Sequence, residues 1–308
     1  MNWYPDLAEE ILEGLYAQIR PALMLFVEAA GYLPDCDIIL MQVAGCLEPH
    51  LLQPAILIKS IPYTNPEIFL EWMNAAVNHG WLYHERGKFG LTDSGREIVE
   101  GLNELCDRLY AKIKVLSDPE MARLRYISDL VIEKIKQQPV EKPAFKLKLL
   151  FSRYLDRPLI VQLRQQMFIV LAFREDARVA SWRPYESDGQ VWETFSLICS
   201  RKAGNAAELV AQLPQRNYST ADYGAALDQL DARGWITLQD DSYIPTGQGV
   251  RVWNDVDKRT DQIFDAAFLG LNNVEMEEFQ GLMRKFSSML SQLENLKKIR
   301  KSALELRQ

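Results

Sequence analysis

The chain has few of the residues from which metal sites and disulfide frameworks are built. Its 308 residues include four cysteines and three histidines. The cysteines lack CxxC spacing, the histidines are scattered, and neither set has the spacing of zinc ligands. These residues are Cys36, Cys46, Cys106, Cys199, His50, His79 and His84. We therefore expect reduced thiols and no bound metal.

The motifs of common enzymes and of membrane proteins are also missing. The sequence contains no glycine-rich phosphate loop, no nucleophile elbow and no apolar run long enough to cross a bilayer. Residues 1–6 lack the basic start of a secretory signal peptide. We expect a cytoplasmic protein that is not an enzyme and uses no cofactor. The alternative is an active site assembled from residues far apart in the sequence.

Length and composition are those of an ordinary globular protein. The chain is 48% hydrophobic and 25% charged, with a formal net charge of −7. A chain of this length exceeds one typical hydrophobic core, so two domains are expected.

An internal duplication supports two domains. Gly80-Trp81-Leu82 precedes Leu91-Thr92-Asp93-Ser94-Gly95, and Gly234-Trp235-Ile236 precedes Pro245-Thr246-Gly247-Gln248-Gly249. The Gly, Trp, Thr and final Gly of the two copies are each 154 positions apart. Four landmarks at one offset indicate a repeated structural unit rather than chance matches.

Each copy has the layout of a winged helix. A helix ends at a glycine, two short β-prone runs form a hairpin, and a long helix begins after a threonine that can cap it. The runs are 81–84 and 88–91 in the first copy, and 235–238 and 242–245 in the second. By position, 65–79 and 220–233 are the recognition helices of two helix-turn-helix units.

Long helices are predicted on both sides of each unit. Those after the wings should span about 93–115 and 247–269. Each is followed by a capping box, with Ser117 and Glu120 in the first copy and Asn272 and Glu275 in the second. The predicted fold is mainly α with small β wings: two tandem winged-helix domains, residues 1–140 and 141–308, flanked by long packing helices.

The junction between the halves is less regular. Residues 137–143 contain two prolines and are the predicted linker. A basic stretch follows from Lys142 to Arg157. Residues 159–173 form an apolar run that fits a helix or a strand, and we favour a helix. Residues 174–191 are expected to form a loop that lengthens the second copy.

The first copy resembles a known family of regulators. Lys88-Phe89-Gly90-Leu91-Thr92-Asp93-Ser94-Gly95-Arg96 resembles the wing-to-helix motif of MarR-type winged helix-turn-helix transcription regulators. A similar pattern occurs in winged-helix dimerisation domains of some methyltransferases. The resemblance implies a single-chain imitation of a regulator dimer, with small-molecule pockets where winged units meet long helices. The second copy departs from the motif at Pro245 and Val250.

The charges of the recognition helices oppose DNA binding. Residues 65–79 contain Glu67 and Glu71 and no lysine or arginine, and residues 220–233 contain three aspartates against one arginine. Since affinity for DNA comes largely from neutralised phosphates, acidic helices would repel the duplex.

Nine residues are candidates for binding. Those for DNA lie at the first hairpin and in the basic stretch; the alternatives are a solvated hairpin tip and the polar face of a helix. Two aromatic residues of the expected loop are candidates for a ligand pocket, with packing between the halves as the alternative. The DNA candidates are His84, Arg86, Lys88, Lys142, Lys146, Lys148 and Arg153, and the ligand candidates are Trp182 and Tyr185.

Two functions follow from these observations. The first is a MarR-like transcription regulator that binds DNA, with or without a small effector. The second is a winged-helix module that no longer reads DNA and binds a protein or a small ligand. A continuous positive surface across the first wing and the basic stretch would favour the first function, and its absence the second.

Overall fold

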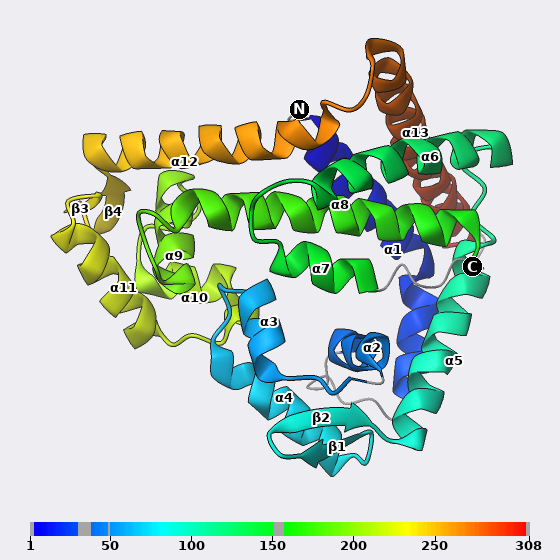
Figure 1. Cartoon of the computed structure of the whole chain (residues 1–308), viewed down its shortest axis with the longest axis horizontal. Helices are drawn as coiled ribbons and strands as arrows, with labels where there is room; N and C mark the ends of the chain where they lie inside the picture. Colours follow the sequence, from blue (N-terminus) through cyan, green and yellow to red (C-terminus); the bar gives the residue numbers. More distant parts are fainter. Residues whose placement is uncertain (1–2, 30–37, 49, 151–156, 306–308) are drawn as a thin grey trace.

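The computed structural model describes residues 3–29, 38–48, 50–150 and 157–305, and their side chains except those of 26–29, 38–42 and 294–305. The protein is mainly helical with two small antiparallel hairpins, which confirms the predicted fold class (Figure 1). No helix in the described ranges is both long and apolar enough to cross a membrane.

The first half places a winged unit between long helices. Its elements, in chain order, are α1 (Trp3–Ala29), α2 (Ile38–Leu47), α3 (Pro54–Ser60), α4 (Pro66–Asn78), β1 (Leu82–Glu85), β2 (Lys88–Leu91), α5 (Asp93–Tyr110) and α6 (Asp118–Lys136). Strand β1 pairs antiparallel with β2, so that Leu82 faces Leu91 and Glu85 faces Lys88. Helix α5 ends at Tyr110, earlier than predicted, and Ile113 and Val115 beyond it are buried in the core.

The second half has the same order of long helices and strands, with α7 added before it and the 3-10 helices η2 and η3 inserted. Its elements are α7 (Pro143–Leu150), α8 (Leu159–Trp182), α9 (Gly189–Cys199), α10 (Ala206–Gln212), the 3-10 helix η2 (Pro214–Arg216), α11 (Thr220–Ala232), β3 (Ile236–Gln239), β4 (Ser242–Pro245), α12 (Gly247–Asp265), η3 (Ala266–Phe268) and α13 (Asn273–Glu305). In the second hairpin Ile236 faces Pro245.

The loop predicted over residues 174–191 is wrong for most of its length. Helix α8 continues to Trp182, and α9 begins at Gly189. Helix α8 is buried on nearly all sides, including at Asp176 and Ser181, so its sequence lacks the one-sided apolar stripe that marks a surface helix. The helix favoured for residues 159–173 is confirmed.

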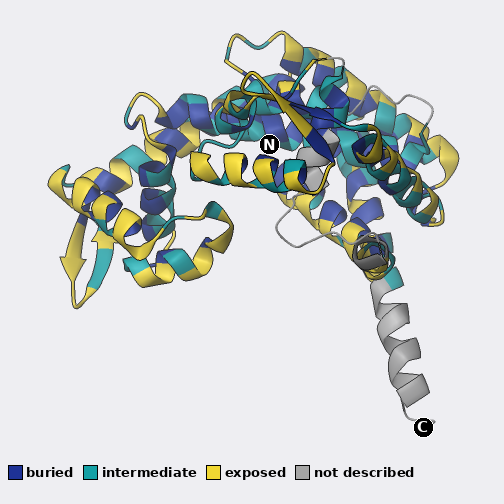
Figure 2. Cartoon of the chain, turned by 90° about the horizontal axis from the view of Figure 1, so that it is seen from below, coloured by how far each residue is buried: buried dark blue, intermediate teal, exposed yellow. Residues whose placement is uncertain are grey.

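The central core is shared by both halves. Helix α1 packs against α13, and α8 packs against α6, α7 and α12. The first long helix of each half, α1 or α8, therefore packs against the last helix of the other half, α13 or α6. In Figure 1, α8 runs through the middle of the molecule between α12 and α7. Figure 2 shows buried residues along the central helices; in the first wing, β2 is largely buried and β1 largely exposed. One core thus contains residues from both sides of the boundary predicted near residue 140, which stays a prediction.

An ion pair joins the two halves where α6 contacts α13. The Arg123 guanidinium donates to the Glu278 carboxylate at 2.9 Å, and these residues are 155 positions apart. Cys46, Cys106 and Cys199 form no disulfide within the described part of the chain, and Cys36 lies outside it.

Candidate nucleic-acid interface

The first wing is anchored by the Gly-Trp pair that ends α4. Gly80 has φ 74°, a left-handed conformation that costs glycine little, and its N–H donates to Val77 O at 2.9 Å. This turn brings Trp81 back against the unit. The Trp81 ring stacks on His79, with centroids 4.8 Å apart, and is 7% exposed. The hairpin is therefore attached to the core by a large aromatic side chain.

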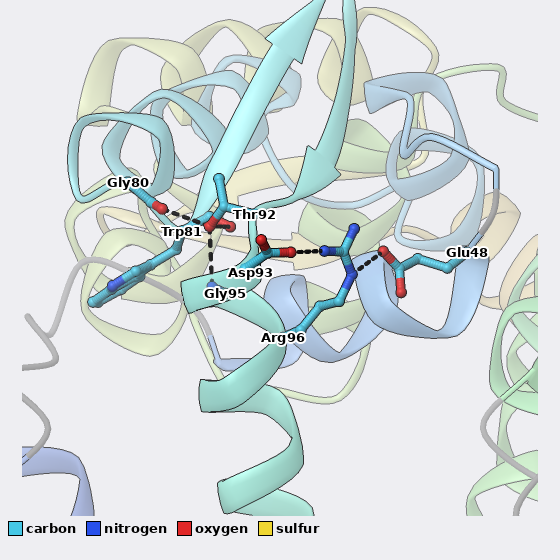
Figure 3. Close-up of polar contacts among 7 residues, drawn as sticks. All are labelled: Glu48, Gly80, Trp81, Thr92, Asp93, Gly95 and Arg96. Atoms are coloured by element: carbon cyan, nitrogen blue, oxygen red, sulfur yellow. Dashed lines mark hydrogen bonds and ion pairs between the residues drawn. The ribbon is translucent and has the colours of Figure 1, made fainter.

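Thr92 connects the hairpin to α5, as Figure 3 shows. Its hydroxyl donates to Gly80 O at 2.6 Å and accepts from Gly95 N–H at 3.0 Å. A Cβ atom on Gly95 would lie 2.1 Å from Trp81 O, so only glycine fits there. The second unit repeats this arrangement. Thr246 donates to Gly234 O at 2.6 Å and accepts from Gly249 N–H at 3.1 Å.

An ion-pair cluster distinguishes the first unit from the second. Arg96 Nε donates to Glu48 at 2.8 Å and Arg96 Nη1 to Asp93 at 2.6 Å (Figure 3). The first contact ties α5 to α2. Val250 and Ala203 occupy the corresponding positions of the second unit, so this ion pair has no equivalent there.

The tip of the first wing presents cations to solvent. Arg86 and Gly87 both have positive φ between paired Glu85 and Lys88, the geometry of a two-residue hairpin turn. His84, Arg86 and Lys88 are exposed. The His84 ring stacks on Phe89 at 4.7 Å and its Nε2 accepts from Gly87 N–H at 3.2 Å. The second wing carries Asp240 and Asp241 in the same turn.

The outer faces of α4 and α11, the predicted recognition helices, are acidic. Glu67 and Glu71 are exposed on α4 beside the uncharged Leu70 and Asn74. The exposed charged residues of α11 are aspartates as well: Asp222, Asp228 and Asp231. These surfaces offer carboxylates where DNA presents phosphates.

The described part of the basic stretch does not form a continuous surface. Lys142 is buried, and its Nζ donates to the carbonyls of Lys136 and Gln138. Lys146 is exposed on α7, whereas Lys148 is partly buried with its Nζ 5.7 Å from the centre of the Phe168 ring. Arg153 lies outside the described residues.

Both aromatic residues that were candidates for a ligand pocket contact other side chains of the chain. Trp182 is 1% exposed, and its indole N–H donates to Tyr63 Oη at 3.2 Å. Its ring also lies parallel to Trp192, with centroids 6.0 Å apart. Tyr185 donates to Asp255 Oδ2 at 2.6 Å. Trp182 thus joins the two halves, which is the packing alternative.

A junction that was not predicted from the sequence links the two winged units. Arg216 Nη2 donates to Glu193 at 2.7 Å and its Nη1 donates to Thr64 Oγ1 at 3.1 Å. Arg216 O accepts from Asn65 N–H at 3.0 Å. A Cβ on Gly189 would lie 2.1 Å from Pro62 O, so the backbones touch here. The one signal of this junction in the sequence is that residues 61–65 align with residues 216–220 at an offset of 155.

This junction limits the separation of the recognition helices. Asn65 precedes α4, and Arg216 lies four residues before Thr220, the first residue of α11. At 3.8 Å per residue, the N-terminal ends of α4 and α11 are less than about 25 Å apart. Helix-turn-helix dimers read half-sites about 34 Å apart. In this conformation, α4 and α11 cannot place their N-terminal ends in successive major grooves.

Replacing Arg216 by alanine should lower the free energy of unfolding by about 2–3 kcal/mol, because it leaves the Glu193 carboxylate, 17% exposed, without its cation. Urea unfolding followed by tryptophan fluorescence measures this loss. The control is Arg125→Ala, which removes an exposed pair with Asp129 and should cost less than about 1 kcal/mol. Equal stability of the two variants would contradict the role of the junction.

A cavity of about 380 Å³ lies beside this junction. It is bounded by residues 59–63, by α7 and α8, and by Arg216, so segments of both units contribute to its wall. Asp176 on α8 lines it and is 2% exposed. The Asp176 carboxylate accepts N–H bonds from Ala144 at 3.0 Å and Phe145 at 2.8 Å, at the start of α7.

Comparison with known proteins identifies one part of the chain. No curated protein and no solved structure matches it. Residues 196–297 match the model of a helix-turn-helix family. This range includes α10, α11, both strands of the second wing and α12. The second winged unit is therefore a helix-turn-helix domain, a type of domain that suggests a DNA-binding regulator rather than an enzyme.

Proposed function

We propose that this protein is a winged-helix regulator that contacts DNA through its first wing. The observation that carries the proposal is the exposed cluster of His84, Arg86 and Lys88 at a hairpin tip held in place by Thr92 and Trp81. The helix-turn-helix match of the second unit supports it.

The chemistry of the surface sets the mode of contact. Base readout in the major groove needs donors and cations on the recognition helix, and α4 and α11 present carboxylates instead. Arg86 and Lys88 can neutralise phosphates, which carry no sequence information. The expected binding is therefore weak, sensitive to salt and nearly independent of DNA sequence.

We further propose that the chain is a MarR-like pseudo-dimer that arose by tandem duplication. The shared offset of the Gly-Trp and Thr-Gly landmarks supports this origin, as do the matching threonine caps. The contact of Arg123 with Glu278, at equivalent positions, supports a pseudo-two-fold axis.

Charge reversal of Arg86 and Lys88 together should weaken DNA binding to a similar extent for all sequences. It should also lower the slope of log K against log salt by about two, one for each lost phosphate contact. Fluorescence anisotropy with labelled random-sequence duplexes, at several salt concentrations, measures both quantities. Changing Glu67 and Glu71 to glutamine should strengthen binding by removing repulsion.

The control reverses Lys112 and Lys114, two exposed lysines just beyond the C-terminal end of α5. This helix has 18 residues, which places the lysines about 27 Å from the wing. Their reversal should leave the salt slope unchanged. Absence of wild-type binding at low salt, or an unchanged slope in the Arg86 and Lys88 variant, would overturn the proposal.

A second function is favoured by the acidic faces of α4 and α11, by the burial of Lys142, which interrupts the basic stretch, and by the cavity. In this alternative, the protein is an interaction module that binds a small ligand or a protein and does not bind DNA. The cavity touches residues 59–63, which lead into α4, and Arg216, which precedes α11. A ligand there would contact both helix-turn-helix units at once.

A further inference from the structure

The cavity beside the junction has an apolar wall. Phe168, Leu171 and Val179 of α8 line one side, and Pro62 and Tyr63 line the side formed by the first unit. A volume of about 380 Å³ falls within the range of small-molecule sites, about 300–1,000 Å³. The apolar wall suits a compact hydrocarbon or aromatic group.

A buried carboxylate lies in the same wall. Asp176 accepts two backbone N–H bonds, and within the described ranges no cation lies at ion-pair distance from it. Glu9 and Glu175 also line the cavity. A buried carboxylate without a cation is stabilised by any donor that a ligand brings.

Cations line the cavity as well. Lys59 is exposed at the end of α3, where its ammonium group can reach a ligand from the rim. Arg174 is 4.0 Å from Asp261 at its Nη2, and its Nε–H is buried without a hydrogen-bond partner in the described part of the protein. Lys148 and Arg216 complete the cationic part of the lining.

We propose that this cavity binds a small amphoteric molecule that carries both an ammonium group and a carboxylate on an apolar body. The ammonium group pairs with Asp176, the carboxylate is held by Lys59 and Arg174, and the apolar body packs on Phe168 and Leu171. A ligand with one sign of charge would leave one set of lining charges unpaired. This site is independent of the DNA contact proposed for the first wing.

Protonation of Asp176 makes the release of a proton a second measurable sign of binding. Burial raises the pKa of Asp176 to about 7, because its charged form is poorly solvated. Glu175 nearby raises this pKa further, and Lys142 lowers it. Glu9, Lys59, Lys148, Arg174 and Arg216 are the other charged groups around the cavity. An ammonium group favours the charged carboxylate, so binding below pH 7 should release a proton.

Three probes with the same phenyl group test the proposal by titration calorimetry on the full chain. L-Phenylalanine carries both charges, 2-phenylethylamine lacks the carboxylate, and 3-phenylpropanoate lacks the ammonium group. We expect L-phenylalanine to bind at least about tenfold more tightly than either of the others, since each loses one charge-assisted contact. Titration in two buffers at pH 6 detects the released proton.

Two variants test which residue binds the ammonium group of the ligand and which binds its carboxylate. Asp176→Asn should weaken both amines about tenfold or more and leave 3-phenylpropanoate unchanged. Lys59→Gln, at an exposed position that cannot disturb the core, should weaken only the two carboxylates. Lys112→Gln is the matched control and should change nothing. Equal affinity for 3-phenylpropanoate and L-phenylalanine, an unaltered response of the amines in Asp176→Asn, or no saturation by any probe up to 10 mM would each overturn the proposal. None of these outcomes depends on DNA.

Discussion

Replacing Trp81 or Trp235 by alanine should lower the free energy of unfolding by about 3–5 kcal/mol, the usual cost of removing a large buried aromatic side chain. The two indoles are 7% and 6% exposed. Trp235 contacts the Phe195 ring at 5.1 Å and lies under the Arg233 guanidinium at 5.3 Å. Alanine would leave a cavity between each hairpin and the helix before it, because the backbone around Gly80 and Gly234 cannot close the gap.

Urea unfolding monitored by circular dichroism measures this loss without relying on tryptophan fluorescence. The neighbouring hairpin residues Tyr83 and Leu238, which are 41% and 57% exposed, provide alanine controls. Their substitution should cost less than about 1 kcal/mol. A cost near zero for Trp81→Ala and Trp235→Ala would show that the wings are not anchored by these rings.

The stability of the protein should depend on pH through Asp176. Its pKa is about 7 in the folded state against 3.8 ordinarily, chiefly because of burial. Between these values the folded state holds a proton that the unfolded chain has released, so the protonated carboxyl stabilises the fold. This contribution is fully present below pH 4 and is lost as pH rises through 7. From pH 5 to pH 8, the loss is about 2–3 kcal/mol.

Asp176→Asn isolates this effect, since asparagine stays uncharged and keeps one acceptor for the α7 amides. The stability difference between the wild type and this variant should shift by about 2–3 kcal/mol in favour of the variant between pH 5 and pH 8. Glu97→Gln, an exposed substitution on α5, is the control. A pH-independent difference for Asp176→Asn would show that the carboxyl does not titrate in this range.

Local sequence patterns were enough to predict most of the helices and strands. The Gly-Trp and Thr-Gly landmarks located both wings, and their hydrogen bonds join residues no more than 12 positions apart. The capping box at Ser117 and Glu120 placed the start of α6 for the same reason. The part of α8 from residue 174 onward was not predicted as helix, because a helix buried on nearly all sides has no periodic apolar stripe.

The candidate site was predictable only in part. The exposure of Arg86 and Lys88 followed from their place at a hairpin tip, and the acidic faces of α4 and α11 could be read directly from helical positions. Lys142 could not be judged in this way. Its position in a basic stretch suggested a surface contact, whereas the chain turns so that backbone carbonyls surround its ammonium group.

The sequence by itself determined two winged units, their caps and the sign of their surfaces, because each depends on neighbours within about one turn or hairpin. Only the tertiary structure decided how the units meet. Arg216 reaches Thr64 across 152 positions, and Asp176 caps α7 from 32 positions away. Such contacts depend on the packing of whole helices, which sets the burial of a charge and the distance between the recognition helices. Neither quantity is encoded in the local spacing of residues.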